Sequence, residues 1–571
     1  MDNTDYMVTS LNKVPTLTLV GDIQGMSHDV YKLLSFNLNF MDGRVLQGFA
    51  KLKWQGDGSL QWVKKNFKLK TYVDDSCQTK LKFKPLADWA SNNEFNLKAN
   101  YMDLTHARNI TNAKLFARMT ATRSNVDETL LHSINFSQIQ GFPIHLLVNG
   151  KSQGLYTLNT GKNSILFNMD KSSLTQASVE AAQYNDTTRF ITANPKFDGT
   201  DFTVEFPDIM TDSIKNSFIN LMNFVNVSNP SAFRADQDQY LDVNSVIDFG
   251  LFSNVIEDTD MNVKNAMYVT YDGKKWMMVP YDLDTSWALQ WDGKSLQNVD
   301  QDLFNFQGNQ LLQKTFESNQ DLVYRRYHDL RTGILRADNI INAFKNFMKH
   351  VGETQYENDL DIWPSLPSQS LTGMAQLQYA IYKRLEVVDQ QIEKHFGGGR
   401  SFITPNYVKN SDAKFDLTDW KTVGTFYRTS FSTSINNGSM GIGCWTTGLK
   451  ENTWSHIESK QILIQGPNDC PVVSFGGKIL VSSGVSLTDE DFIGISIRFR
   501  DSNQKEISNV TVAADKTLID FPQMLKAENI KTPQGTSWIQ FEFNFSRNGH
   551  AILTQPQLNF TPTLGQYSSC D

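Results

Sequence analysis

Three polar residues near the middle of the chain combine residue types and a spacing that could do chemistry. Asp260 is followed five positions later by Asn265, and Asp282 lies beyond a short segment rich in apolar residues. A carboxylate beside a hydroxyl group can orient it or accept its proton, whereas carboxylate and amide oxygens are the ligands that magnesium prefers. The pattern therefore indicates a base beside a site for a hard cation.

The order of these groups is that of the catalytic residues of protein kinases, in which one aspartate accepts the substrate proton while an asparagine and a later aspartate hold magnesium. We therefore predict that Asp260 is the base and that Asn265 and Asp282 are metal ligands. Period-2 alternation would place Asp284 on the same strand face as Asp282, which makes it a further metal candidate. The alternative is that Asp258 and Asp260 merely end a helix and that Asp282–Asp284 is a surface turn. The simultaneous fit of three positions favours catalysis.

A helix and a hairpin must position these side chains. Apolar residues recur every four positions from Ile247 to Val255, which predicts an apolar helix stripe just before the acidic residues. The segments AMYVTY (266–271) and KWMMVPY (275–281) flank a turn at Asp272-Gly273, and this pattern predicts two strands of a hairpin. The acidic residues would then lie at the end of a helix and at the end of a strand.

A glycine-rich turn lies far upstream, between two predicted strands. Alternating apolar residues over 14–55 predict antiparallel strands, and a lysine-rich strand follows within 60–72. Backbone N–H groups of such a turn can cover phosphates, and a lysine of the next strand can reach them. We predict that Lys65 is this lysine, with Lys64 as the alternative if the register shifts by one. The turn residues assigned to the phosphates are Gly56, Gly58 and Ser59.

A strand followed by a helix is predicted within residues 94–119, and the next hairpin, within 142–159, turns at Asn149-Gly150. Arg108 falls in the first turns of this helix. It could bind a phosphate, or it could form a buried pair with Asp103 that connects the strand to the helix. The buried pair is slightly preferred, and Arg108 is also kept among the candidate nucleotide-binding residues.

These segments together resemble the CotH (spore-coat protein H) family of atypical kinases. The matching patterns are D-x-x-x-K-N, a hairpin and D-L-D within 260–284, W-Q-G-D-G-S and K-K-N-F within 54–67, and L-x-V-N-G-x-x-x-G-L-Y-T-L at 146–158. The segment LKANYMD-x-T-x-ARN at 97–109 resembles the bacteriophage-associated branch of the family, and its matching positions are Asp103, Arg108 and Asn109.

The resemblance covers about residues 15–395 and implies an α+β fold with an atypical protein-kinase-like domain that uses ATP and magnesium. One position departs from the expected pattern. An acidic partner for the nucleotide lysine is expected near the end of the second strand of the 142–159 hairpin, where the chain has Asn159. Glu180, in the helix-like segment 173–184, could take its place. The resemblance assigns Asp260 to catalysis, Gly56, Gly58, Ser59, Lys65 and Arg108 to the nucleotide, and Asn265, Asp282 and Asp284 to the metal.

Glycines 397–399 are predicted to end this domain, which spans 1–396, and to begin a linker over 397–403. Clean alternation in IGISIRF (493–499) and IQFEFNF (539–545) predicts that 404–571 is an all-β, jelly-roll-like sandwich. The start of this part resembles carbohydrate-binding modules of phage tail proteins and glycosidases. Trp420 is predicted in its core. Three other aromatic residues could stack on sugar rings, although a core position is preferred for each: Tyr427, Trp445 and Trp454.

Composition narrows the range of partners and compartments. The chain has 571 residues, 53 lysines and arginines, 61 aspartates and glutamates and a formal charge of −8, so no nucleic-acid partner is expected. The N-terminus lacks an apolar signal segment, and no run of about eighteen apolar residues occurs, so no membrane partner is expected. The four cysteines are scattered, which favours free thiols.

Two functions follow from these patterns. The first is a phage or prophage tail-associated kinase that transfers the γ-phosphoryl group of ATP to a protein hydroxyl. The second is a catalytically inert phage protein that binds host cell-wall polysaccharide through its sandwich. Both place the chain in the virion, or in the bacterial cytoplasm before assembly, with other phage tail proteins as partners.

Overall fold

A computed structural model describes most of the chain. The described residues are 14–56, 58–123, 125–367, 373–397, 408, 411, 417, 419–430, 440–446, 454–463, 472–482, 487–546, 549–560 and 564. The chain forms two compact units, residues 1–326 with 343–388 and residues 327–342 with 389–571. The predicted linker at 397–403 lies outside the described residues apart from Gly397, so the predicted domain boundary stays a prediction.

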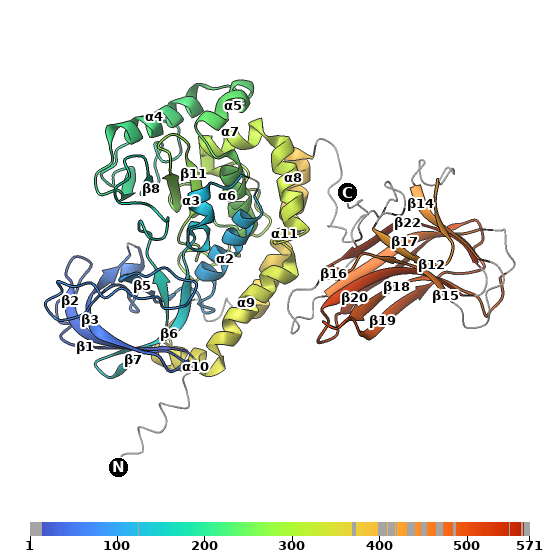
Figure 1. Cartoon of the computed structure of the whole chain (residues 1–571), viewed down its shortest axis with the longest axis horizontal. Helices are drawn as coiled ribbons and strands as arrows, with labels where there is room; N and C mark the ends of the chain where they lie inside the picture. Colours follow the sequence, from blue (N-terminus) through green and yellow to red (C-terminus); the bar gives the residue numbers. More distant parts are fainter. Residues whose placement is uncertain are drawn as a thin grey trace, which may run out of the picture. The chain divides into compact units, whose positions relative to one another are not determined.

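Seven strands at the start of the first unit close into a barrel, coloured blue to teal in Figure 1. β1 pairs antiparallel with β2, and β2 with β3, as the alternation over 14–55 predicts. Parallel pairing of β1 with β6 closes the barrel. Because successive side chains point to opposite faces, one apolar set per strand faces inward and is buried, as Leu17 and Leu38 are. In barrel order the strands are β1 (Thr16–Val20), β2 (Lys32–Asn39), β3 (Val45–Gln55), β4 (Asn66–Tyr72), β5 (Glu94–Lys98), β7 (Lys151–Thr160) and β6 (Gly141–Val148).

The hairpin of β6 and β7 confirms the prediction from Asn149-Gly150. Asn149 has φ +50° and Gly150 has φ +74°. Two successive residues with positive φ give the turn whose twist matches that of the flanking strands, and asparagine followed by glycine adopts this conformation most easily.

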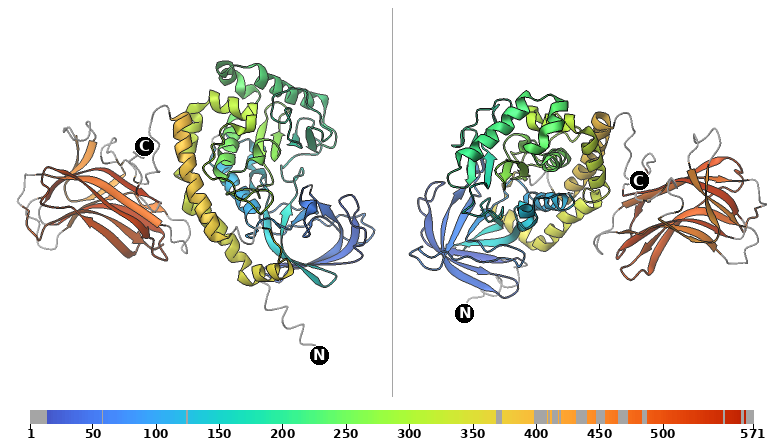
Figure 2. Two further views of the ribbon diagram at one scale, coloured as in Figure 1. Left: turned by 180° about the vertical axis from the view of Figure 1, so that it is seen from behind. Right: turned by 45° about the horizontal axis from the view of Figure 1, so that its top comes forward.

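A four-stranded antiparallel sheet and six α-helices form the next part of the first unit, beside the barrel in both Figure 1 and Figure 2. The sheet order is β11, β10, β8, β9. Phe218 and Trp276 lie edge to face 4.8 Å apart and join α4 to the sheet region. The elements are α2 (Arg108–Ala121), α3 (Glu128–Leu131), β8 (Ala177–Ala181), β9 (Phe202–Phe206), α4 (Asp212–Val227), α5 (Pro230–Asp236), α6 (Val243–Ile256), β10 (Ala266–Thr270), β11 (Met277–Pro280) and α7 (Gln310–Ser318).

The predicted hairpin before Asp282 is confirmed as β10 and β11, and the predicted apolar helix is α6. The helix-like segment 173–184 is a wrong prediction, because its centre forms strand β8. Ala177, Val179 and Ala181 are buried at every second position, and β8 pairs with β9 and β10. Pairing with two neighbouring strands overrides the helical tendency of the alanine-rich sequence.

Long helices complete the described part before the linker. Arg326 of α8 forms an ion pair with the buried Asp248 of α6 at 2.7 Å. Apolar residues of α11 at spacings of three and four, from Leu377 to Ile392, are buried and form one face of the helix. α8, α9 and α11 each contain residues of both units. The helices are α8 (Gln320–Arg331), α9 (Ala337–Val351), α10 (Glu353–Ile362) and α11 (Met374–Phe396). No described helix is long and apolar enough to cross a membrane.

The second unit contains the predicted β-sandwich. IGISIRF lies in β18 and IQFEFNF in β21, which are hydrogen-bonded neighbours with their apolar residues buried. Trp420 is also buried, as predicted, whereas the side chains of Tyr427, Trp445 and Trp454 lie outside the described part. One sheet has β12 (Trp420–Val423), β15 (Trp454–Ser459), β21 (Trp538–Ser546), β18 (Phe492–Arg500) and β19 (Glu506–Ala513), with β16 (Ile462–Leu463) beside β21. The other has β13 (Phe426–Ser430), β14 (Met440–Thr446), β22 (Gly549–Asn559), β17 (Val472–Val481) and β20 (Pro522–Lys531).

Candidate functional site

A cavity of about 610 Å³ lies between the barrel and the four-stranded sheet of the first unit. Its barrel side comes from β3, β4 and β5, and its other side from β8, β9 and the segments that flank β10 and β11. Among the nine predicted site residues, Lys65 and Arg108 lie elsewhere. The other seven line this cavity together: Gly56, Gly58, Ser59, Asp260, Asn265, Asp282 and Asp284.

The glycine-rich turn connects β3 to β4 through a short 3-10 helix, Gly58–Gln61. Gly56 has φ +107°, and a Cβ there would collide with the Ser59 hydroxyl, so this position requires glycine. Asn66 holds the turn in place: its Nδ2 donates to Ser59 Oγ at 3.1 Å, and its Oδ1 accepts from the Ala99 N–H at 2.7 Å. The turn is therefore fastened to β5 across the end of β4.

Local backbone geometry brings the amide and the second aspartate together. The Tyr281 N–H donates to the Asn265 carbonyl at 3.2 Å, which extends the β10–β11 ladder by one pair. Asn265 Nδ2 donates to the Asp282 carbonyl at 3.2 Å. Asp260 begins a 3-10 turn, and its carbonyl accepts from the Asn265 N–H at 3.1 Å. The three residues are thus linked through the backbone.

The predicted strand alternation of Asp282 and Asp284 is wrong. β11 ends at Pro280, and Asp282 has φ +58°, a left-handed conformation in which no strand continues. Both side chains line the cavity nevertheless. A turn at this point, and not the pleat of a strand, directs them there.

Lys98, the last residue of β5, forms an ion pair with one of the acidic residues. Its Nζ lies 3.0 Å from Asp282 Oδ1, and the pair connects the barrel to the sheet region. Asn109 Nδ2, on α2, approaches the same oxygen at 3.5 Å. Kinases also carry their nucleotide lysine on a strand that follows the glycine-rich loop. The signal was present in the segment LKANYMD, where Lys98 follows the alternating Phe95 and Leu97.

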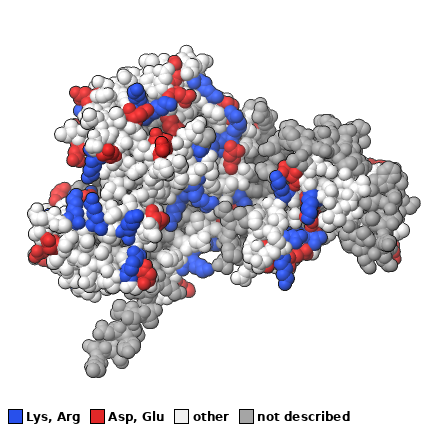
Figure 3. All heavy atoms as spheres, viewed as in Figure 1, with Lys and Arg blue, Asp and Glu red and all other residues white. Residues whose placement is uncertain are grey.

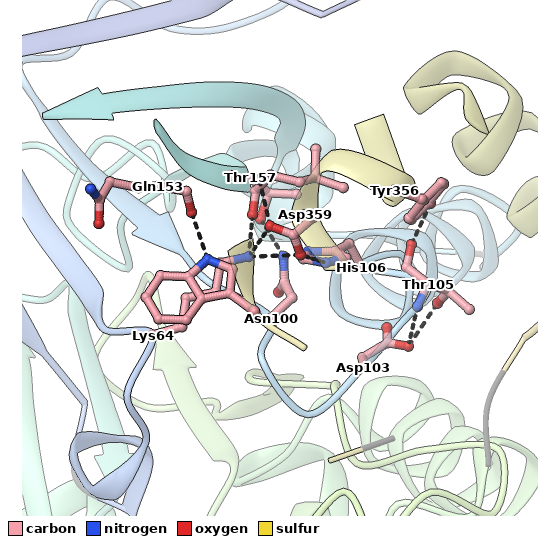
Figure 4. A network of polar contacts seen from close by, with 12 residues as sticks. Lys64, Asn100, Asp103, Thr105, His106, Gln153, Thr157, Tyr356 and Asp359 are labelled. Carbon is pink, nitrogen blue, oxygen red and sulfur yellow. Dashed lines mark hydrogen bonds and ion pairs between the residues drawn. The ribbon is translucent and has the colours of Figure 1, made fainter. Parts of the chain in front are cut away.

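Neither of the two predicted lysines lines this cavity. Lys65 Nζ donates to the Leu60 carbonyl at 2.5 Å and lies over the Trp54 ring, away from the acidic residues. Lys64 is fully buried and pairs with Asp359 of α10 at 2.7 Å (Figure 4). The two consecutive lysines precede β4 and point to different surroundings, and neither lines the cavity that contains Asp282.

Arg108, which was also assigned to the nucleotide, does not line the cavity either. Its guanidinium is completely buried and donates to Asp103 Oδ1 at 2.5 Å, to the Ser286 carbonyl at 2.9 Å and to Gln376 Oε1 at 2.8 Å. This arrangement corresponds to the other predicted use, a buried pair with Asp103. Because its side chain is fully buried and bonded to protein oxygens, Arg108 presents no exposed surface to a phosphate.

Glu180 pairs with Lys162, which follows β7, and not with either predicted lysine. Lys162 also lies 3.1 Å from Glu205 of β9 and 4.9 Å from the Tyr281 ring centre. Asn159, where an acidic partner was expected, is buried in β7, and neither of its amide atoms has a hydrogen-bond partner among the described residues.

Burial and charge give the carboxyl groups different pKa values. Burial opposes ionisation of Asp282, but the charges of Lys98, Lys162 and Lys264 outweigh it and lower its pKa. Burial, followed by the charge of Asp282, raises the pKa of Asp284 to about 8. Burial raises the pKa of Asp260 as well, although a hydrogen bond from Tyr184 opposes this. A cation bound among these groups would favour their ionised forms.

The side-chain oxygen atoms of Asn265 and Asp282 are of the type that magnesium prefers. Within the described residues, no group of three or more His, Cys, Asp or Glu side chains is arranged to hold a metal ion by itself. Magnesium is usually held by one or two carboxylates together with substrate phosphates and water, so a larger protein cage is not needed. The Asn265 amide donates through Nδ2, and its Oδ1 therefore remains to bind a cation.

A second cavity, of about 710 Å³, adjoins the first and is rich in lysine. The two share Gln55, Lys68, Lys162 and Tyr281. Lys80, Lys82 and Lys171 also line the second cavity, and only three acidic residues accompany its five lysines. Figure 3 shows Lys and Arg side chains gathered on the barrel at its edge toward the helical part. This end of the combined cleft is electropositive and suited to phosphate groups.

The chain matches a family model described as CotH kinase protein over residues 52–397, which is more than half of its length. This range contains the glycine-rich turn, Lys98, the acidic residues and every other residue that lines the cavity except His28. A search of curated proteins finds no match to the chain.

The solved structures that are similar to part of the chain include a phage tailspike domain and carbohydrate-binding modules. The enzymatically active domain of bacteriophage CBA120 tailspike protein 4 is 13% identical with a TM-score of 0.22, covering 27% of this chain and 21% of that one. TmCBM61 in complex with β-1,4-galactotriose is 16% identical with a TM-score of 0.20, covering 27% and 98%. The xylan-binding CBM22-1 domain of Paenibacillus barcinonensis Xyn10C is 15% identical with a TM-score of 0.19, covering 25% and 86%.

Proposed function

The chain belongs to the CotH kinase family, and from this premise we propose that its first unit transfers the γ-phosphoryl group of ATP to a hydroxyl group. One observation carries the proposal: the glycine-rich turn, the Lys98–Asp282 pair, Asp260 and Asn265 all line a single cavity. These are the groups that phosphoryl transfer needs, namely phosphate-binding backbone, a cation, a base and metal ligands.

The nucleotide phosphates would lie between the turn and Lys98. Backbone N–H groups near Gly56 and Ser59 would donate to phosphate oxygens, and the Lys98 ammonium would neutralise part of their charge. Lys68 and Lys162 extend the positive surface toward the lysine-rich cavity. The polyphosphate therefore has a cationic path on one side of the acidic centre.

The acceptor hydroxyl would lie at Asp260. The oxygen of the acceptor hydroxyl forms a bond to the γ-phosphorus of ATP. The bond between that phosphorus and the bridging oxygen breaks, and ADP leaves with the electron pair. The hydroxyl proton passes to the Asp260 carboxylate, whose raised pKa makes it a better proton acceptor than an exposed aspartate. Magnesium held by Asn265 and Asp282, with Asp284 beside them, would neutralise charge on the phosphate oxygens.

Magnesium-dependent ATP binding to the full chain, measured by calorimetry, tests the proposal. The wild type is expected to bind only with magnesium, and Asp282→Ala is expected to lose this dependence together with most of the affinity. Asp238→Ala is the matched control, because Asp238 is an exposed carboxylate outside every residue set discussed above. If the folded wild type does not bind ATP, the kinase proposal is refuted, and the alternative of a catalytically inert protein that binds polysaccharide remains.

We further propose, for the second unit, that the sandwich binds carbohydrate such as host cell-wall polysaccharide, in a phage tail or virion setting. Its two-sheet architecture and the resemblance of its first residues to carbohydrate-binding modules support this proposal. Retardation of the chain in native gels that contain cell-wall polysaccharide would support carbohydrate binding. Mass spectrometry of purified phage particles would test the virion location.

A further inference from the structure

A third cavity, of about 340 Å³, continues from the acidic centre on a side that shares no residue with the lysine-rich cavity. It shares Asp260, Thr285 and Trp291 with the central cavity. Among the described residues that line it, Asp260 is the only ionisable one. The remaining lining is dominated by amide side chains: Gln290, Gln297, Gln301 and Gln307.

Trp291 is 62% exposed, although it adjoins the catalytic cavity. A well-bonded turn carries it. The Gln290 N–H donates to the Ser295 carbonyl at 3.1 Å, and the Asp292 carboxylate accepts from the Lys294 and Ser295 N–H groups at 2.8 and 3.0 Å. A rigid turn that presents a large aromatic ring to solvent beside a base is suited to hold a ligand against that ring.

The lining selects a chemical class of acceptor. Gln307 Nε2 donates to the Thr259 carbonyl at 3.0 Å, so part of this lining is already bonded within the protein. A glutamine amide carries two N–H donors and an acceptor oxygen, and the groups that face the cavity match the neighbouring hydroxyl groups of a sugar ring. An indole face matches the apolar C–H face of the same ring. A charged peptide would find no opposite charge here apart from Asp260, which is committed to the reacting hydroxyl. The volume lies at the lower end of the range for small-ligand sites.

We propose that the hydroxyl phosphorylated at Asp260 belongs to a neutral carbohydrate bound between Trp291 and the four glutamines. The inference rests on the proposed function, and it specifies the substrate class of that site. The sugar oxygen bonds to the γ-phosphorus of ATP, its proton passes to Asp260, and the products are a sugar phosphate monoester and ADP. A neutral peptide that supplies a serine or threonine hydroxyl is the competing class.

The test is transfer of radiolabelled γ-phosphate by the full chain with magnesium. The acceptors are cellohexaose, maltohexaose, the hexamer of N-acetylglucosamine, and a neutral peptide of glycine, serine and threonine. We expect label in at least one glycan. Trp291→Ala should raise the glycan KM about tenfold or more with a smaller effect on kcat, because stacking contributes to binding. Trp291→Phe should restore part of the affinity, and the KM for ATP should not change.

Leu296→Ala is the matched control, because Leu296 is an exposed apolar residue of the same turn that does not line the cavity. It should behave as the wild type. Label in the peptide and in no glycan would overturn the proposal, as would glycan transfer that Trp291→Ala leaves unchanged. Trp291→Ala and Leu296→Ala both leave the sandwich unchanged. A difference in glycan KM between them therefore cannot come from carbohydrate bound by the sandwich.

If no acceptor is labelled, saturation-transfer NMR with the same glycans tests whether they bind at Trp291. Glycan signals that require Trp291 would support the site, and their absence, or equal signals from Trp291→Ala, would overturn it. Magnesium-dependent ATP binding is measured in parallel. Retained ATP binding without a Trp291-dependent glycan signal refutes the substrate class alone, whereas lost ATP binding refutes the kinase function.

Discussion

Asp359→Ala should release α10 from the barrel, because this buried carboxylate holds four contacts there. It accepts from Lys64 Nζ at 2.7 and 3.0 Å and from His106 Nε2 at 3.1 Å (Figure 4). It also accepts from the Leu155 N–H at 2.7 Å. The exposed fractions of the Lys64 and Asp359 side chains are 0% and 3%. Burial lowers the pKa of His106, so the neutral ring donates through Nε2.

The cost follows from the loss of one partner in a buried ion pair, about 3–5 kcal/mol of unfolding free energy, since Lys64 would be left buried without a counter-charge. Lys64→Met combined with Asp359→Leu removes both charges, so it should be clearly more stable than Asp359→Ala. The pKa of Asp359 is lowered from 3.8 to about 2, because Lys64 and His106 outweigh the effect of burial. Its stabilisation is therefore complete above about pH 4 and should fall by about 2 kcal/mol as the pH approaches 2.

Hydrogen exchange measured by mass spectrometry over a urea series gives the unfolding free energy of the first unit separately from that of the sandwich. The informative peptides cover α10 and β7, which Asp359 joins. Asp361→Ala is the matched control, an exposed carboxylate on the same helix. A loss below about 1 kcal/mol in Asp359→Ala, or a double variant no more stable than the single one, would refute a stabilising role of the pair.

Three further predictions follow. Lys98→Met should weaken magnesium–ATP binding at least about tenfold by calorimetry, whereas Lys65→Met should stay near the wild type; equal losses would contradict the assignment. Burial raises the pKa of Glu257 to about 7, so the folded chain keeps a proton that the unfolded chain loses, and its unfolding free energy should fall between pH 5 and 8. Glu257→Gln should reduce that fall by about 2–3 kcal/mol in urea titrations; an unchanged pH profile would count against it. Gly154 has φ +82°, and a Cβ there would collide with Asp359 Oδ1, so Gly154→Ala should cost at least about 2 kcal/mol in the same measurement; a near-neutral variant would disprove the clash.

Local patterns in the sequence were sufficient for most of the fold and for the acidic half of the site. Strand alternation, the Asn149-Gly150 turn and the apolar helix before Asp260 depend on neighbours within a few residues, and the structure confirms these elements. Asn265 and Asp282 flank a single hairpin, so the chain itself determines that they meet. The kinase family could likewise be recognised from short motifs, and the family match confirms it.

Long-range packing decided the cationic half of the site, which sequence spacing does not encode. Lys64 and Lys65 are adjacent, but Lys64 pairs with Asp359, 295 residues away in the chain. Lys98 pairs with Asp282, which is 184 residues away. Glu180 became a strand residue through pairing with two neighbours, and Arg108 was buried by contacts with distant segments. Which charged side chain faces a cavity depends on which partners desolvate it, and those partners come from segments that meet only in the folded chain.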